Sequence, residues 1–113
     1  MKSDRVEKTH SKYHNIKCEC NGIKFDSKKE MRRYNELYLL QTRGLITELE
    51  LQPWYTLIEG NNKFRRMTYK ADFRYRDADG NMIVEDVKGM KTAVYKLKRK
   101  MMYSILGILV VEV

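Results

Sequence analysis

Residues 68–88 read TYKADFRYRDADGNMIVEDVK, and this stretch decides the fold. Two runs rich in β-branched and aromatic residues, 68–76 and 82–88, flank the sequence DADGN at 77–81. Asp, Asn and Gly favour turns, and a loop of this length commonly joins two antiparallel strands. The stretch therefore predicts a β-hairpin made of strands 68–76 and 82–88.

Side-chain alternation along this hairpin predicts a site with two carboxylates and one lysine. Successive side chains of a strand point to opposite faces, so Asp86 and Lys88 share a face. If Arg76 pairs with Met82, Asp72 falls opposite Asp86, and Cβ atoms in such a pair lie about 5 Å apart. Carboxylates that close repel each other unless a cation lies between them, and their hard oxygens suit Mg²⁺ or Mn²⁺.

Lys88 adds a compact positive charge to the same predicted site. An ammonium there can stabilise negative charge on a phosphate and help to orient or activate the attacking water. The pattern therefore favours a metal-dependent phosphodiesterase built on Asp72, Asp86 and Lys88. The other interpretation is an ordinary charged outer face, in which Asp86 and Lys88 form a surface ion pair.

A helix is predicted from Ser27 to Gly44, and it offers a third acidic residue. Ser27 and Glu30 form a capping-box pattern, and Gly44 suits the helix end. One face carries apolar and aromatic residues at helical spacing: Met31, Tyr34, Leu37 and Tyr38. Glu30 falls within this arc, whereas Glu36 lies on the far side. Glu30 is thus either only a helix cap or the third acid of the site, acting with Asp72 and Asp86 in catalysis and metal binding.

The remaining pattern predicts an α/β (α+β) sandwich with a mixed sheet flanked by helices. Asn21-Gly22 suits the turn of an opening hairpin, 15–20 with 23–25. Further strands are expected at 46–51, 54–58 and 108–113, the last apolar enough to be buried on both faces. Thr92 caps a second helix that runs to residue 106 and ends at Gly107. Residues 1–14 are expected to form a flexible polar tail, and residues 15–113 one domain with the order hairpin, helix, several strands, helix, strand.

The chain is strongly basic, which indicates a polyanionic partner. Its 113 residues contain 23 Lys and Arg against 15 Asp and Glu, a net charge of +8. Such a surface attracts nucleic acid or an anionic membrane. The cations cluster, with six among residues 88–100 and four among residues 63–70. DNA is the partner that this charge and the candidate phosphodiesterase site favour together.

The second predicted helix separates into an apolar face and a basic face. The expected core face consists of Val94, Leu97, Met101 and Ile105. The opposite face carries Lys96, Arg99, Lys100 and Tyr103, with Lys91 just before the helix. We expect Lys91, Lys96, Arg99 and Lys100 to hold the DNA backbone, which adds affinity and salt dependence but no sequence reading. A solvated helix face is the other interpretation.

The expected location is the cytoplasm. No apolar run approaches the roughly 20 residues that a membrane span needs, and the polar start of the chain predicts neither signal peptide nor anchor. Cys18 and Cys20 follow His10 and His14 in the spacing H-x3-H-x3-C-x-C. This series is a weaker candidate for zinc, and reduced thiols are the favoured interpretation.

These motifs resemble the PD-(D/E)XK nuclease superfamily, whose shared core runs helix, three strands, helix, strand. The first motif reads Ala71-Asp72 in place of Pro-Asp, and the second reads Asp86-Val87-Lys88. More narrowly, the chain resembles a family of small phage and prophage proteins of uncharacterised domain. That likeness rests on KYHN at 12–15, GIKFDSKKE at 22–30, LELQP at 49–53, ADF at 71–73 and VEDVKG at 84–89.

The resemblance implies that Asp72 and Asp86 bind metal, that Lys88 is the catalytic lysine and that Glu30 is the first-helix acid. Glu85 is a rival for the second acid, but strand alternation puts it on the opposite face from Lys88. Similar proteins include Holliday-junction resolvases, which act as homodimers so that two sites cut two strands. The resemblance thus implies a nuclease of phage recombination or DNA processing in a bacterial host.

The sequence is compatible with three functions. The favoured one is a Mg²⁺-dependent DNA endonuclease, structure-selective in the manner of a junction resolvase. The alternative is a nucleic-acid-binding module on the same fold that does not cut, although such a module has no reason to crowd carboxylates near phosphate. A protein-interaction factor is the third, and the excess positive charge argues against it.

Overall fold

The computed structural model describes residues 18–113, so the predicted tail and residues 15–17 of the first predicted strand lie outside the described part. The described residues form two compact units, which divide between Glu36 and Leu37. The first contains the predicted hairpin, β2 (Cys18–Cys20) paired antiparallel with β3 (Ile23–Phe25). Asn21 and Gly22 form its turn with φ of 53° and 76°, as the Asn-Gly pair predicts.

Helix α1 (Lys28–Thr42) has the predicted ends. The Ser27 hydroxyl accepts the backbone N–H of Glu30 at 3.1 Å, which satisfies one of the unpaired donors of the first turn. At the other end Gly44 has a φ of 77° and donates to the carbonyl of Gln41. Tyr34 and Leu37 are buried as predicted.

Tyr38 departs from the predicted apolar face of α1, because its side chain is 48% exposed. A tyrosine at the border of an apolar stripe can keep its polar end in water. Glu36 is exposed as expected and pairs with Arg33 at 2.9 Å.

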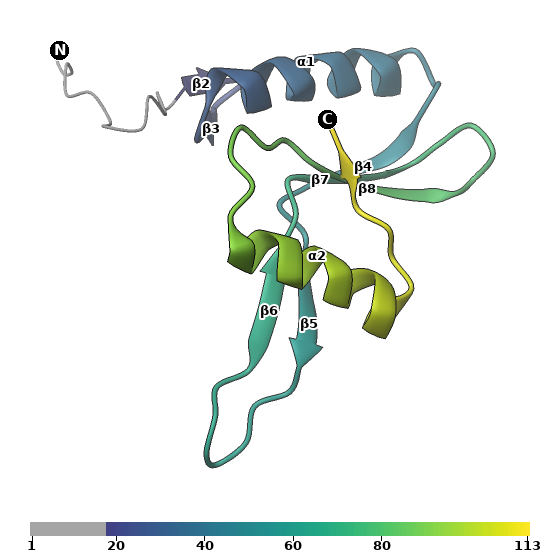
Figure 1. Ribbon diagram of the computed structural model, residues 1–113. Helices are drawn as coiled ribbons and strands as arrows, with labels where there is room; N and C mark the ends of the chain where they lie inside the picture. The colour runs from purple at the N-terminus through teal and green to yellow at the C-terminus, as the bar shows by residue number, and fades with distance from the viewer. Residues whose placement is uncertain (1–17) are drawn as a thin grey trace, which may run out of the picture. The chain divides into compact units, whose positions relative to one another are not determined.

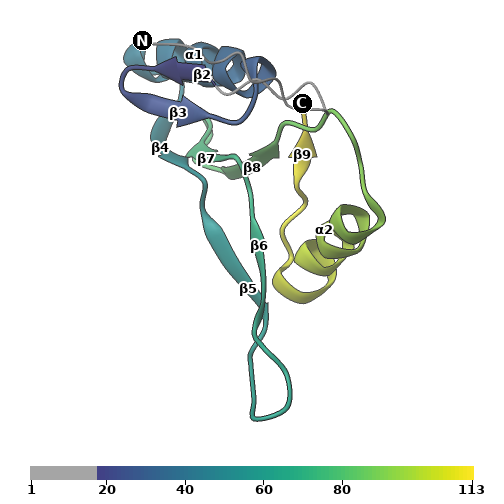
Figure 2. The ribbon, with the colours of Figure 1, turned by 90° about the vertical axis from the view of Figure 1, so that its left-hand side faces the viewer.

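The second unit is built on a mixed four-stranded sheet, which confirms the α+β fold class. Its strand order is β4-β7-β8-β9, and only the β8–β9 pair is parallel. A separate hairpin, β5–β6, and helix α2 complete the unit. The bounds are β4 Thr47–Leu51, β5 Trp54–Ile58, β6 Met67–Lys70, β7 Phe73–Arg76, β8 Met82–Asp86, α2 Ala93–Leu106 and β9 Val111–Glu112. Figure 1 and Figure 2 both show α2 beside the root of the β5–β6 hairpin, whose tip extends beyond the helix.

The prediction of one strand over residues 68–76 is wrong, because the chain changes partner at Ala71 and Asp72. β6 pairs with β5, whereas β7 pairs with β4 and β8. The segment that pairs with it is interrupted at the same level, between β4 and β5. There the backbone N–H of Gln52, which has a φ of 52°, donates to the carbonyl of Asp72, and the N–H of Ala71 donates to the carbonyl of Pro53. Periodicity within one segment does not reveal this change, since alternation continues through the break.

The predicted core face of α2 is also wrong, although its ends are right. Thr92 caps the helix and Gly107 ends it with a φ of 73°. The buried residues are Tyr95 and Met102, however, while Val94 and Leu97 are 62% and 53% exposed. The buried stripe is therefore rotated by about 100°, one residue, from the most apolar stripe. Ile105 is 50% exposed as well, and Met101 is only partly buried.

Specific partners account for this rotation. The Tyr95 hydroxyl donates to Glu112, and a buried tyrosine needs such a partner. Arg99, on the same side, donates from Nε and Nη2 to the carbonyl of Val110 at 3.0 and 2.8 Å. Tyr95 and Met102 complete a core with residues of the strands: Leu57, Tyr69, Ala71, Val84 and Val110.

The last strand is shorter and more exposed than predicted. Only Val111–Glu112 pairs with β8, at the edge of the sheet. Val110 is fully buried, but Leu109 and Val111 are 63% and 40% exposed. The expected burial on both faces is thus wrong, since Val110 packs in the core that α2 completes while its neighbours Leu109 and Val111 stay exposed.

Candidate active site and nucleic-acid surface

Asp86, the last residue of β8, is fully buried. Its Oδ2 accepts a hydrogen bond from the Tyr69 hydroxyl. Its Oδ1 is buried and accepts no hydrogen bond from the described residues, and the Lys88 Nζ lies 3.3 Å from it. Burying a carboxylate is costly unless it is paired, so Asp86 depends on Tyr69 and Lys88 for its compensation.

The electrostatics of Asp86 reflect this burial. Burial raises the pKa of Asp86, the nearby Lys88 ammonium opposes the rise, and the Glu112 carboxylate adds to it. Lys88 is itself only partly exposed, and its Nζ lies 4.8 Å from the centre of the Tyr95 ring. The lysine charge is therefore held between a carboxylate and the face of an aromatic ring, which also attracts cations.

Asp72 lies just before β7, at the end of the β7–β8 ladder. The register that the site prediction assumed is observed, with Arg76 opposite Met82 and the pairing continuing inward along both strands. Beyond the last pair, the Asp72 Oδ2 accepts the backbone N–H of Val87 at 2.7 Å. This bond ties the Asp72 carboxylate to the residue between Asp86 and Lys88. The three predicted residues are thus gathered at the end of β8.

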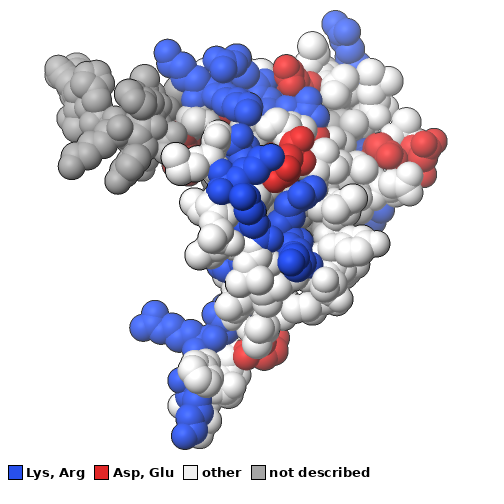
Figure 3. Space-filling view, in the orientation of Figure 1, with Lys and Arg blue, Asp and Glu red and all other residues white. Residues whose placement is uncertain are grey.

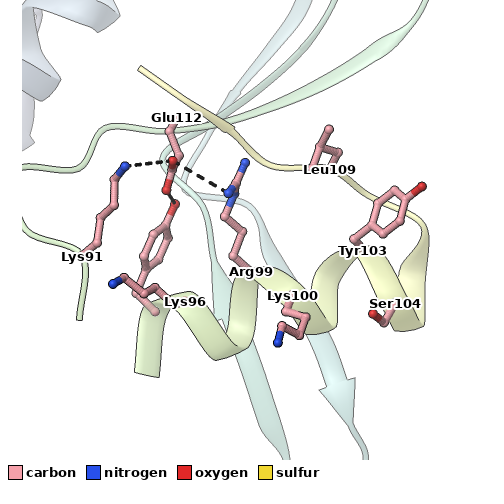
Figure 4. Close-up of a pocket in the computed structure, with 9 residues that line it drawn as sticks. Lys91, Lys96, Arg99, Lys100, Tyr103, Ser104, Leu109 and Glu112 are labelled. Carbon is pink, nitrogen blue, oxygen red and sulfur yellow. Dashed lines mark hydrogen bonds and ion pairs between the residues drawn. The ribbon is translucent and has the colours of Figure 1, made fainter. Parts of the chain in front are cut away.

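Glu112 is a member of this cluster that the sequence interpretation missed. The parallel register sets it beside Asp86 on the neighbouring strand. Its Oε2 accepts the Tyr95 hydroxyl at 2.7 Å, and its Oε1 lies 3.1 Å from Lys91 Nζ and 3.8 Å from Arg99 Nη1. These contacts are drawn in Figure 4. The one available signal was a single charge in the apolar run 108–113.

The Tyr95–Glu112 hydrogen bond shifts both partners. The Tyr95 hydroxyl, then Lys91, lowers the pKa of Glu112. Burial raises the pKa of Tyr95 well above its usual range, and the hydrogen bond to Glu112 raises it further. Tyr95 therefore stays a neutral donor, and it joins the sheet cluster to the surface of α2.

The four cations predicted to hold DNA line one hollow of about 450 Å³ beside α2. Its lining comprises Lys91, Lys96, Arg99 and Lys100 together with Tyr95, Tyr103, Ser104, Leu109 and Glu112. Figure 4 shows these side chains along the helix and the strand that follows it. In Figure 3, Lys and Arg also gather over the start of α2. A polyanion lying along this surface would meet cations that adjoin the Asp86 cluster through Glu112.

Two other acids from the sequence interpretation have distinct positions. Glu85 is 1% exposed and its Oε2 accepts the Tyr75 hydroxyl, on the face of β8 opposite to Asp86. Glu30 is 5% exposed and lies in the first unit. That Glu30 joins Asp72 and Asp86 stays a prediction. Two members of the weaker zinc series, His10 and His14, lie outside the described residues.

The chemistry of the carboxylates suits Mg²⁺ better than zinc. Within residues 18–113, no three His, Cys, Asp or Glu side chains are grouped so as to hold a metal ion. Mg²⁺ needs no such group, since proteins commonly hold it by one or two carboxylates and leave its other positions to water and substrate phosphate. The buried Oδ1 of Asp86 already lies 3.3 Å from the Lys88 Nζ, so a metal ion bound there would share this oxygen with the lysine. Asp86, and Asp72 bonded to the backbone of Val87, are thus the carboxylates at the end of β8 that could hold Mg²⁺.

A family model described as "Protein of unknown function (DUF1064)" matches residues 10–106. The chain belongs to the DUF1064 family. The DUF1064 match includes Glu30, Asp72, Asp86 and Lys88 and all four cations of the hollow, and it ends before Glu112. No curated protein matches the chain, and no solved structure matches it.

Proposed function

We propose that this DUF1064 protein is a Mg²⁺-dependent endonuclease that hydrolyses phosphodiester bonds in DNA. The observation that carries the proposal is the buried Asp86 carboxylate, with Lys88 Nζ 3.3 Å away and Asp72 bound to the intervening backbone. A fully buried carboxylate is costly even with a hydrogen bond from Tyr69 and an ion pair with Lys88, and a purely structural role does not require one. Beside a basic surface, this arrangement suits chemistry on a phosphate.

The residues divide into binding and reacting groups. The cations beside α2 would hold the DNA backbone through its phosphates, without reading bases. Asp72 and Asp86 would hold Mg²⁺, which when bound supplies Lewis acidity at a phosphoryl oxygen. Lys88 would stabilise the charge that develops as water adds to phosphorus and the P–O bond to the leaving oxygen breaks. Tyr69 would hold Asp86 in position through its hydrogen bond to Oδ2.

The cellular role that fits is a structure-selective nuclease of phage recombination or DNA processing, acting in the bacterial cytoplasm on substrates such as Holliday junctions. Within residues 18–113, no helix is long and apolar enough to cross a bilayer. A homodimer would let two sites cut two strands. The exposed apolar face of α2, with Val94, Leu97 and Ile105, is a surface that a second copy could cover.

The homodimer is tested by mass in solution. Leu97→Glu should give a monomer by light scattering at concentrations where the wild type is a dimer. Glu36→Gln, at an exposed residue of α1, is the control and should keep the wild-type mass. A wild-type protein that is monomeric at high micromolar concentration would contradict the dimer and leave the nuclease proposal standing.

The nuclease is tested by cleavage of labelled four-way junction, flap and duplex DNA with Mg²⁺ or Mn²⁺. Asp86→Asn and Lys88→Ala should each lose cutting, whereas Asp79→Ala, at an exposed turn acid, should retain it. Cleavage that needs metal and is lost in both site variants would support the proposal. Cleavage that survives in Asp86→Asn would point to a contaminant or another site.

A second candidate is a nucleic-acid-binding module that does not cut. The observation in its favour is that Asp72 and Glu112 already accept hydrogen bonds from the chain, as structural carboxylates do. Mg²⁺ discriminates the two, because it should tighten DNA binding to a metal site but only screen charge in a simple binder. Binding that falls steadily with Mg²⁺, without cleavage of any substrate, would favour this module.

A further inference from the structure

The β5–β6 hairpin, residues 54–70, is a second candidate binding element and is called here the hairpin arm. One of its faces is core: Leu57 and Tyr69 are buried, with Tyr55 and Met67 packed against them. The other face carries the cross-strand pairs Trp54–Lys70 and Thr56–Thr68. The arm therefore has one side anchored on the core of the second unit and one side open.

The open side presents an aromatic ring under a cation. Trp54 is 65% exposed, and Lys70 Nζ lies 5.3 Å from the centre of its ring. Trp54 and Thr56, together with Thr68, Arg65 and Arg66, line a hollow of about 660 Å³. A single exposed apolar residue is ordinary on a protein surface. An indole in a hollow with two guanidinium groups and two hydroxyls is a combination that suits a ligand with both rings and anions.

The tip of the arm holds a phenylalanine outward on a well-bonded loop. Asn61 Oδ1 accepts the backbone N–H groups of Lys63 and Phe64 at 2.7 and 2.9 Å, and Asn61 N–H donates to the Phe64 carbonyl. A Cβ at Gly60 would lie 2.8 Å from Arg66 N, so the loop closes only with glycine there. Phe64 is 74% exposed at this tip. The loop thus presents the ring in a defined place.

Charge selects the class of ligand. The arm contains one acidic residue, Glu59, and four basic residues: Lys63, Arg65, Arg66 and Lys70. In Figure 3 the lower end of the view, where the tip of the arm lies, shows several blue side chains among white ones and one red patch. Alternating cations and exposed aromatic rings are the means by which proteins hold single-stranded nucleic acid, since phosphates pair with cations and unpaired bases stack on rings.

We propose that the hairpin arm binds unpaired nucleotides, with Phe64 and Trp54 stacking bases and Arg65 and Arg66 holding phosphates. This inference rests on the proposed function in taking DNA as the substrate, and it names the substrate class as DNA with unpaired bases, such as flaps, forks and open junctions. Paired bases are already stacked on both faces, so a rigid exposed ring gains little on intact duplex. The arm would favour sites where strands separate.

The test uses Trp54 as its own reporter, because it is the only tryptophan in the chain. The full protein in EDTA, which prevents metal-dependent cutting, is titrated with a single-stranded oligonucleotide and with the matching duplex. Trp54 fluorescence should be quenched by the single strand much more than by the duplex. Phe64→Ala should weaken single-strand binding about tenfold, as expected for one lost stacking contact. Leu45→Ala, which also shortens an exposed apolar side chain, should not.

The cations are tested in the same way. Arg65→Gln with Arg66→Gln should lower both the affinity and its dependence on salt, whereas Arg43→Gln outside the arm should not. Equal affinity of Phe64→Ala and Leu45→Ala for the single strand would overturn the inference, and so would Trp54 fluorescence that does not change when single-stranded DNA is added. A blue shift of Trp54 with anionic phospholipid vesicles and no change with DNA would also overturn it, in favour of a membrane surface.

The outcomes separate this inference from the nuclease proposal. If single-strand binding depends on Phe64 but no substrate is ever cut, the proposed role of the hairpin arm is supported and the nuclease proposal is contradicted. The opposite outcome is a wild-type protein that cuts DNA while Phe64→Ala cuts flap and duplex at wild-type rates and binds single strands as Leu45→Ala does. That outcome would support the nuclease proposal and contradict the proposed role of the hairpin arm.

Discussion

The Asp86 cluster and the hairpin arm place charge in opposite environments. Asp86 is fully buried and its contacts with Tyr69 and Lys88 are specific, whereas Phe64 and Trp54 are mostly exposed beside solvated cations. A buried charge depends on each partner, because the interior offers little screening. Exposed contacts are individually weak and add together. Substitutions should therefore have abrupt effects in the first region and graded effects in the second.

The largest expected effect is on cleavage. Lys88→Ala removes the one cation in ion-pair contact with Asp86 among the described residues, and it should lower the rate of phosphodiester cleavage by at least about 100-fold. DNA binding in EDTA should change by less than about threefold, which shows that the loss is in chemistry. Rates are measured on the preferred labelled substrate at saturating protein. A Lys88→Ala rate within a few-fold of the wild type would remove Lys88 from the site.

A graded effect is expected for the cations beside α2. Lys96→Gln with Lys100→Gln should weaken binding to every DNA sequence by about tenfold. The slope of log affinity against log salt should become shallower by about 1 for each lost phosphate contact. Fluorescence anisotropy at several salt concentrations measures both. An unchanged slope would show that these two lysines are a solvated face.

A stabilising effect is expected for Asp86→Asn in EDTA. Because burial raises the pKa of Asp86 in the folded state, its ionised form weakens the fold, and this cost grows as the pH rises through that pKa. Lys88 is partly exposed, so it can be solvated once the charge is gone. The melting temperature should rise by about 4 °C at pH 7.5, or about 1 kcal/mol.

The pH dependence checks the cause. The difference between Asp86→Asn and wild type should shrink as the pH falls through the raised pKa of Asp86, since the wild-type carboxyl is then neutral as well. Thermal melts at pH 7.5 and in mild acid give this comparison. A variant that melts below the wild type at pH 7.5 would mean that the Lys88 ion pair outweighs the cost of burial.

The last expected effect, that of Tyr95→Phe, has a similar size and the opposite sign. The change removes the hydrogen bond to Glu112 while keeping the buried ring, and it should cost about 1 kcal/mol of unfolding free energy. Urea denaturation measures it. Tyr103→Phe, at an exposed position on the same helix, is the matched control and should be neutral. Equal unfolding free energies for the two variants would show that the Glu112 contact adds nothing to stability.

The parts of the fold that local chemistry specifies were predictable from sequence. The Asn21-Gly22 turn, the Ser27 and Thr92 caps and the Gly107 end were predicted at their observed positions. The pairing of Arg76 with Met82, which the site prediction assumed, is also observed, because the turn between them limits how the strands can meet. These features involve residues a few positions apart, where steric and hydrogen-bonding preferences act directly.

The same holds for part of the candidate site. Asp72, Asp86 and Lys88 lie on one hairpin, so strand alternation and register were enough to gather them. Tyr69 was missed because the unpredicted break at Ala71 and Asp72 separates β6 from β7, and Glu112 was missed because it reaches Asp86 from a strand distant in sequence. No periodic pattern specifies which distant strand supplies a partner. Only the assembled sheet does.

What the sequence by itself determined was both helices with their ends, most of the strands and the chemistry concentrated on one hairpin. Tertiary structure alone decided the break at Ala71, the edge position of β9 and the buried face of α2. In α2 the stripe with Tyr95 and Met102 is buried in place of the more apolar stripe, because packing and satisfied hydrogen bonds outweigh periodicity when a helix meets a sheet. Local conformational preferences act between residues that are near in sequence, whereas the burial of a side chain depends on which residues distant in sequence pack against it.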